Sequence, residues 1–188
     1  MSVPRLIFLA GPNGAGKSTY YRTFLSTSGL LFVNADEITR KLGVPNAEAA
    51  KFADGARETL LSSGESFITE TVFSDPVGAK LDFLRRAITT GYDVQVHFIS
   101  ISGADISEVR VMQRVAQGGH DVPSDRLERR FHQSLQNLGE AITFVPDVRV
   151  FDNSDTDRPF RLVLRSERGQ IILRAHPFPE WLAVAGDA

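Results

Sequence analysis

A glycine-rich segment near the start of the chain, GPNGAGKST at residues 11–19, holds the residue types best suited to chemistry. It matches the pattern G-x-x-x-x-G-K-[ST], follows the apolar run Leu6–Leu9 and precedes a predicted helix. Glycines let backbone N–H groups turn toward phosphate oxygens, and a helix N-terminus adds partial positive charge. Lys17 can reach the β- and γ-phosphates, and the Ser18 hydroxyl can bind Mg²⁺. We therefore expect ATP with Mg²⁺ as the bound nucleotide. The candidate nucleotide contacts are Gly11, Asn13, Gly14, Ala15, Gly16, Lys17, Ser18 and Thr19.

The same nine residues are typical of ABC transporter ATPases, which is the first alternative. Such a domain should carry an LSGGQ-like signature before an apolar run that ends in Asp-Glu. The sequence has no such signature, and the run Asp93–Ile101 ends in Ser-Ile-Ser. We reject this alternative. The loop by itself predicts a nucleotide-binding fold and leaves the reaction open.

Two carboxylates follow predicted strands and are candidates for acid–base chemistry. Asp36 comes just after the apolar run Leu30–Ala35, and Glu70 lies in the run Ser66–Thr71. Ligands of a parallel sheet bind at the carboxyl ends of its strands, so both acids are expected to face the phosphate loop. Asp36 is the better general-base candidate, and Glu70 suits acceptor binding or the metal side, although the two roles could be exchanged. The alternative is that Asn34 or Asp36 only caps a helix over Glu37–Leu42.

An arginine-rich stretch over residues 110–131 predicts a lid over the phosphates. Arg110 and Arg114 are spaced i, i+4 on one helix, residues 117–123 form a Gly-Gly turn, and Arg126 and Arg130 share a face of the next helix. Such a lid excludes water and neutralises charge on a transferring phosphoryl group. The alternative is two amphipathic helices with basic solvent faces. We expect Arg114 and Arg130 to act on the phosphates, and Arg110 and Arg126 to contact the substrate. His120 is a further candidate for substrate binding, and the alternative is that it only terminates the turn.

The elements that must position these residues alternate along the chain. Predicted strands cover Arg5–Ala10, Leu30–Ala35, Ser66–Thr71, Asp93–Ile101 and Asp147–Asp152. Predicted helices cover Ser18–Ser28, Ala47–Ser63, Val77–Thr90, Ile106–Gln117 and Ser124–Thr143. Strand alternating with helix indicates right-handed βαβ units, and hence an α/β fold with a parallel sheet and helices on both faces.

The C-terminal part differs from this alternation. The apolar runs Phe160–Arg165 and Gln170–Arg174 flank a turn at residues 166–169, which predicts a hairpin added to a sheet edge, followed by a short helix near Trp181. We expect a single domain over residues 1–188, with the lid at about 110–130 and a hairpin and tail extension over 158–188.

Composition excludes several classes of protein. The chain has 188 residues, a net charge of −2 and no cysteine, so disulfides and cysteine-bound zinc are excluded. Neither the charge nor any apolar run suggests a nucleic-acid or membrane partner. The first ten residues contain too short an apolar run for a signal peptide, and we expect a cytoplasmic protein.

Taken in order, GPNGAGKST, VNADEI at 33–38, Glu70-Thr71, the segment RV…GGHDVP…RRF and FDNS at 151–154 resemble the compact bacterial branch of the zeta-toxin kinases. The resemblance implies a three-layer P-loop kinase fold with a five-stranded, mostly parallel sheet in the order 2-3-1-4-5. It also implies Asp36 as the base, Glu70 with Thr71 in acceptor binding, and phosphate contacts from Arg114 and one of the arginines at 126, 129 and 130. By analogy with related kinases, Asn153 would lie beside the adenine.

The function implied is transfer of the γ-phosphoryl group of ATP to a hydroxyl of a small molecule, with a UDP-amino sugar as the leading acceptor. Glu70 is followed by Thr71-Val72-Phe73-Ser74, which departs from the Gly-Thr pattern of the sugar-nucleotide toxins, so the acceptor pocket is expected to differ. The alternative is an NTP-hydrolysing switch controlled by a protein partner such as an antitoxin.

Overall fold

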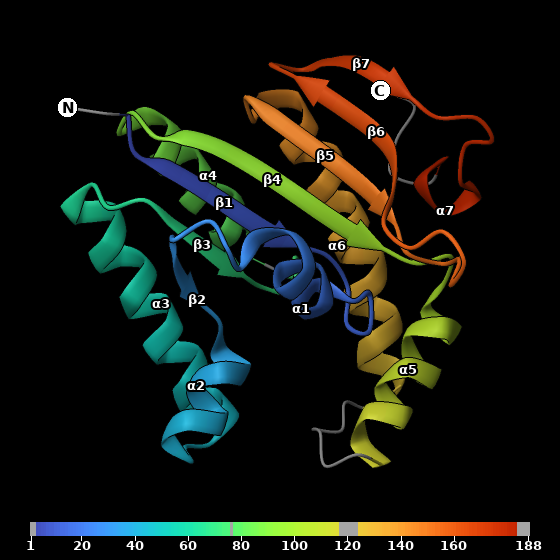
Figure 1. Cartoon of the computed structure of the whole chain (residues 1–188), viewed down its shortest axis with the longest axis horizontal. Helices are drawn as coiled ribbons and strands as arrows, with labels where there is room; N and C mark the ends of the chain where they lie inside the picture. The colour runs from blue at the N-terminus through green and yellow to red at the C-terminus, as the bar shows by residue number, and fades with distance from the viewer. Residues whose placement is uncertain (1–2, 76, 117–123, 184–188) are drawn as a thin grey trace.

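A computed structural model describes residues 3–75, 77–116 and 124–183, and these residues form a single mixed sheet of seven strands in the order β2-β3-β1-β4-β5-β6-β7 (Figure 1). The strands are β1 (Arg5–Ala10), β2 (Leu31–Val33), β3 (Phe67–Glu70), β4 (Asp93–Ser100), β5 (Asp147–Asp152), β6 (Arg161–Glu167) and β7 (Gln170–Arg174). The first five are parallel, which confirms the predicted order 2-3-1-4-5. The last two are antiparallel and lengthen the sheet beyond the five strands expected.

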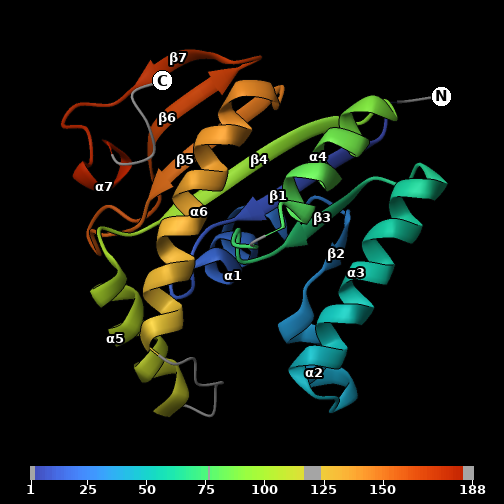
Figure 2. The same cartoon turned by 180° about the vertical axis from the view of Figure 1, so that it is seen from behind.

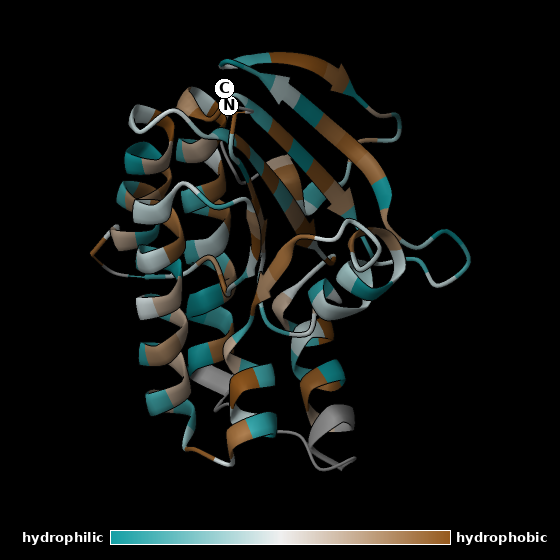
Figure 3. Cartoon of the chain, turned by 60° about the vertical axis from the view of Figure 1, so that its left-hand side comes forward, coloured by the Kyte–Doolittle hydropathy of each residue, from teal (hydrophilic) through white to brown (hydrophobic). Residues whose placement is uncertain are grey.

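Helices cover both faces of this sheet. They are α1 (Lys17–Tyr20), a π-helix (Tyr21–Leu25), α2 (Ala35–Leu42), α3 (Asn46–Ser63), α4 (Ala79–Thr89), α5 (Ala104–Ala116), α6 (Ser124–Phe144) and α7 (Glu180–Ala183). The helices α4 and α6 lie over the face that is toward the viewer in Figure 2, and α1 lies behind the sheet. Hydrophobic and hydrophilic residues alternate along the flanking helices (Figure 3), as expected for helices with one side on a core.

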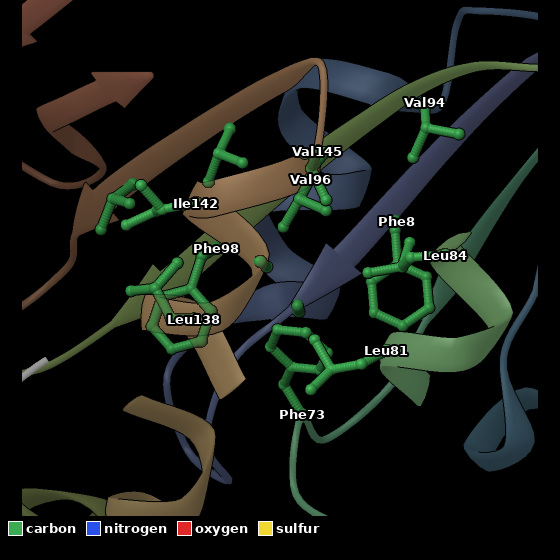
Figure 4. Close-up of a cluster of buried hydrophobic side chains, with 14 of the residues drawn as sticks. Phe8, Phe73, Leu81, Leu84, Val94, Val96, Phe98, Leu138, Ile142 and Val145 are labelled. Carbon is green, nitrogen blue, oxygen red and sulfur yellow. The ribbon is translucent and has the colours of Figure 1, made fainter. Parts of the chain in front are cut away.

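The larger core lies between the central strands and α4 and α6. Val94, Val96 and Phe98 point to this face from β4 and pack with Phe8 of β1 (Figure 4). Leu84 and other apolar side chains of α4 and α6 cover them. A smaller core on the opposite face packs Ile7, Leu9 and Ile99 of the sheet under the segment after the phosphate loop. The central strand β1 is buried on both faces after Arg5, and its sequence is apolar without alternation. The strand β4 instead alternates over residues 94–98, where Gln95 and His97 separate the three apolar residues.

The C-terminal hairpin is confirmed, with a tighter turn than predicted. The strand β6 runs through Glu167, so that only Arg168 and Gly169 form the connection. Both have positive φ, 50° and 82°, which is the conformation of a type I′ turn whose twist matches that of paired strands. The predicted four-residue turn is wrong because Ser166 and Glu167 pair with β7.

The helix predicted after the phosphate loop is regular for only one turn. It continues as a π-helix over Tyr21–Leu25 and does not reach Ser28 as α-helix. In the part of the chain that the structure describes, none of the helices combines the length and hydropathy needed to cross a bilayer.

Candidate active site

The phosphate loop connects β1 to α1 and is shaped by close backbone contacts. Gly11 has φ +138°, and a Cβ there would lie 2.0 Å from the carbonyl oxygen of Ile99, so only glycine fits. The buried Lys17 folds its ammonium group back onto the loop, with Nζ 3.0 Å from the Gly11 carbonyl and 2.7 Å from that of Pro12. A bound phosphate would compete for this ammonium group, as the sequence pattern predicts.

Two later segments hold the loop from outside. The Ser107 hydroxyl of α5 donates to the Asn13 carbonyl at 2.6 Å, and Asn153 Nδ2 donates to the Ala15 carbonyl at 2.9 Å. Arg110 in turn donates to the Asn153 carbonyl at 3.0 Å. The structure therefore places Arg110 and Asn153 beside the loop as supports for its backbone. Their predicted contacts with substrate and adenine stay predictions.

An aromatic cluster packs against the same turn of the loop. A Cβ at Gly16 would lie 2.5 Å from Asn153 Nδ2 and 3.6 Å from the ring of Phe160. Phe160 has a positive φ of 57° and lies edge-on to Tyr20 and Phe24, with ring centroids 5.4 and 5.7 Å apart. A non-glycine residue in this conformation costs free energy, and the packing of its ring offsets that cost.

Glu70, at the end of β3, is the centre of the polar site. Both of its carboxylate oxygens accept from the Ser18 hydroxyl, at 2.9 and 3.0 Å, and Oε2 also accepts from Asn34 Nδ2 at 2.7 Å. Burial raises the pKa of Glu70 above its ordinary value, and the nearby charge of Asp36 adds to this. Lys17 and the two hydrogen bonds act in the opposite direction. The structure thus connects the phosphate loop directly to the carboxyl ends of β2 and β3.

Asn34 is the residue that caps α2. Its Oδ1 accepts from the Glu37 backbone N–H at 3.2 Å while its Nδ2 donates to Glu70. The suggestion that Asp36 serves as the cap is wrong, because Asp36 lies inside the first turn of α2. Its side chain is exposed and close enough to Glu70 for its charge to act on that carboxylate.

The oxygen donors at this site fit Mg²⁺. Ser18 and Glu70 offer a hydroxyl and a carboxylate, the hard oxygen ligands that this ion prefers. Asn13 Oδ1, on the loop, is a buried acceptor without a hydrogen-bond donor among the described residues.

The predicted lid is only partly described. Residues 117–123, with His120, lie outside the described residues, as does the side chain of Arg114. Arg126 is exposed and Arg130 is partly buried on α6. Thr71, the remaining predicted substrate contact, donates its backbone N–H to the Leu9 carbonyl at 3.0 Å and so continues the β3–β1 pairing.

Sequence reasoning missed two supports of the site. Ser107 belongs to no motif, so its bond to the phosphate loop was not predicted. The bond from Asn34 to Glu70 joins two segments that are 36 residues apart, and neither segment alone indicates it. The only signal was that Asn34 ends an apolar strand, which marked the position without showing where its amide points.

The parallel order, the phosphate loop after β1 and the carboxylate bound to its serine define a protein with the P-loop kinase fold. The sequence model of the family described as Zeta toxin matches residues 2–161. The chain therefore belongs to the zeta toxin family.

Individual relatives are distant. An uncharacterized protein of Haemophilus influenzae is 26% identical over 132 residues, which are 68% of this chain and 92% of that one. The structure of AvrRxo1-ORF1:-ORF2 with ATP superposes with a TM-score of 0.70 at 20% identity over 91% of this chain, which spans only 60% of that chain. The PezAT toxin–antitoxin system of Streptococcus pneumoniae gives a TM-score of 0.60 at 19% identity, over 88% of this chain and 72% of that one. At 19–20% identity, these two superpositions show a shared fold alone.

Proposed function

We propose that the protein transfers the γ-phosphoryl group of ATP to a hydroxyl of a small molecule. The observation that carries the proposal is the network joining Ser18 of the phosphate loop to Glu70 and Asn34 at the ends of β3 and β2, with Asp36 beside it. A nucleotide held by the loop would present its terminal phosphate at this edge of the sheet, where parallel sheets bind their ligands. The structure of AvrRxo1-ORF1:-ORF2, a fold neighbour, contains ATP.

Each residue has a distinct part in this proposal. Asp36, exposed at the start of α2, accepts the proton of the attacking hydroxyl. Glu70 is held by the Ser18 hydroxyl, so we assign it to the metal side together with Ser18. Bound Mg²⁺ would supply neutralisation of the phosphate charge. Lys17 leaves the loop carbonyls for the phosphate oxygens, and the lid arginines, with Arg114 and Arg130 foremost, close over them.

The acceptor proposed from family membership is a UDP-amino sugar. The second candidate function is an NTP-hydrolysing switch controlled by an antitoxin, and the fold neighbour from a toxin–antitoxin system supports a protein partner of this kind. The two differ in one product, because a switch transfers phosphate only to water.

Mass spectrometry distinguishes them. The protein is incubated with ATP, Mg²⁺ and a panel of sugar nucleotides, nucleosides and cell extract, and a new phosphorylated species is sought. Asp36→Asn and Lys17→Ala should abolish its formation, whereas Glu48→Gln, on the exposed side of α3, should leave it unchanged. ADP and free phosphate as the only products support the switch, and a transfer rate unaffected by Asp36→Asn contradicts the assigned base.

A further inference from the structure

The helix α5 lies directly against the phosphate loop, and its Ser107 is buried at that contact. The Ser107 hydroxyl donates to the Asn13 carbonyl at 2.6 Å, and the residue is only 1% exposed. A Cβ at Gly14 would lie 2.9 Å from the Ser107 carbonyl oxygen and 3.4 Å from the Cβ of Arg110. A side chain at Gly14 would therefore push α5 away from the loop.

The same face of α5 also holds Asn153, the second support of the loop. Ser107 and Arg110 are spaced i, i+3, so their side chains leave one face of the helix. Arg110 donates to the Asn153 carbonyl at 3.0 Å, while Asn153 Nδ2 donates to the Ala15 carbonyl at 2.9 Å. This face therefore fixes two carbonyls of the loop, that of Asn13 directly and that of Ala15 through Asn153.

Each of these bonds sets the direction of the next N–H group along the chain. Both peptide bonds are trans, so the C=O of one residue and the N–H of the next point in opposite directions. The bond to the Asn13 carbonyl therefore turns the Gly14 N–H away from α5, and the bond to the Ala15 carbonyl turns the Gly16 N–H away from Asn153. Among the described residues neither N–H has an acceptor, so both are available to a bound group.

The sequence of the loop does not by itself hold these two peptide units in place. Gly14 and Gly16 have positive φ, 70° and 95°, and glycine changes its backbone conformation more easily than other residues. A rotated peptide would present its carbonyl oxygen to a phosphate in place of its N–H, and the two oxygens would repel each other. A donor outside the loop on each carbonyl opposes that rotation, so the loop is preorganised before the nucleotide binds.

We propose that Ser107 is a positioning residue for phosphoryl transfer, which keeps the Gly14 N–H directed at the phosphates of the nucleotide, and that Asn153 does the same for the Gly16 N–H. This inference rests on the proposed function, since it takes the loop as the nucleotide site. It deepens that function because α5, the helix that leads into the predicted lid, becomes part of the phosphate-binding apparatus without touching the nucleotide through Ser107.

Calorimetric titration of the full chain with ADP and with pyrophosphate, each with Mg²⁺, tests this role. Pyrophosphate has no adenine, so it reports on the loop alone. Ser107→Ala is expected to weaken the binding of both probes about tenfold, because it leaves the Asn13 carbonyl without its donor. Ser107→Thr keeps the hydroxyl and should restore both affinities. Unchanged affinities in Ser107→Ala overturn the proposal, and the ADP titration decides if pyrophosphate binds too weakly to measure.

Ser134→Ala, on α6, is the matched control. Ser134 is equally buried, but its hydroxyl donates to the Arg130 carbonyl of its own helix, at 2.7 Å. This variant should bind both probes as the unaltered protein does, and equal weakening by Ser107→Ala and Ser134→Ala overturns the assignment. Asn153→Ala should also weaken both probes, whereas a loss for ADP alone would assign Asn153 to the adenine and overturn its positioning role.

A measurement on the unaltered protein decides if Ser107→Ala does not fold. The amide resonances of Gly14 and Gly16 should shift as ADP and Mg²⁺ saturate the site, because the phosphates then accept from these N–H groups. Saturation without a shift at either glycine overturns the inference. Transfer to an acceptor is measured separately, so that weaker probe binding by Ser107→Ala in a protein without transfer activity would support this inference and contradict the proposed function.

Discussion

Asn34 makes two hydrogen bonds, one that caps α2 and one to Glu70, and two substitutions distinguish their contributions to stability. Asn34→Asp keeps an acceptor for the Glu37 N–H but replaces the donor to Glu70 with a second carboxylate, 2.7 Å from the first in the unaltered geometry. Asn34→Ala removes both bonds. A hydrogen bond to a charged group contributes about 1.5–3 kcal/mol, and an N-cap about 1 kcal/mol. We therefore expect Asn34→Ala to lower the free energy of unfolding by about 2.5–4 kcal/mol at any neutral pH.

Asn34→Asp is expected to behave differently with pH. Two adjacent carboxylates cannot both ionise cheaply, so they retain a proton in the folded protein that the unfolded chain releases, and the folded-state pKa is raised. The sign follows from linkage: stability relative to the unaltered protein should be highest near pH 5 and should fall as pH rises toward 8. Each unit of added pKa shift corresponds to about 1.4 kcal/mol.

Urea unfolding followed by circular dichroism at pH 5, 6.5 and 8 measures these differences. Asn46→Ser, at an exposed asparagine whose side chain accepts from Thr39, serves as the control and should be independent of pH. A penalty for Asn34→Asp that is the same at pH 5 and pH 8 would refute the reasoning, because it would mean that the substituted carboxylate does not meet Glu70.

Three further predictions concern the loop and two side chains whose pKa is lowered by burial, His97 and Lys80. Gly11→Ala should abolish ATP binding or folding, whereas Gly29→Ala, with positive φ but open space around it, should cost only about 1 kcal/mol in urea unfolding. Burial lowers the pKa of His97 to about 4, and the charge of Arg149 adds to this effect. Between pH 6.5 and pH 4 the unfolded chain therefore binds a proton that the folded chain does not, and stability should fall by about 3 kcal/mol over this range. His97→Gln should remove that dependence in acid titrations and His132→Gln, which is exposed, should not. Burial lowers the pKa of Lys80 to about 8, so between pH 8 and pH 10.5 the unfolded chain holds a proton that the folded chain has released. Stability should therefore rise by about 3 kcal/mol over this range, and a flat profile would contradict the lowered pKa.

The positions of most strands and helices could be predicted from local sequence patterns, but the order of the strands and the type of one helix could not. The bounds of β1 and β5 were predicted without error. The unbroken apolar run of β1 marks a strand buried on both faces, whereas β5 buries Val148 and Val150 in alternation with partly exposed residues. The order 2-3-1-4-5 came from the family resemblance, since alternation of strand and helix does not fix which strands are neighbours. The π-helix at Tyr21–Leu25 was not predicted, because its sequence is as compatible with an ordinary α-helix.

The sequence predicted that groups of the phosphate loop and Glu70 lie together, but it did not predict the side-chain hydrogen bonds that hold them. Lys17, Ser18 and Glu70 could be placed together because the ends of parallel strands and the loop after β1 meet at one edge. The amide bonds of Asn34 and Asn153 to distant partners depend on side-chain direction in the folded protein, which no spacing encodes. The burial of Lys80 was missed for the same reason, since a lysine in an amphipathic helix normally faces solvent.

The bond from Asn153 to the Ala15 carbonyl spans 138 residues of the chain, and this separation has a consequence for synthesis. The loop that would bind the nucleotide is translated well before the residue that supports it. At translation rates of about 5–20 residues per second, a ribosome needs about 7–28 s between the two. Throughout that interval the loop lacks the bond from Asn153 to its Ala15 carbonyl, so the loop is completed only after a distant segment has left the ribosome.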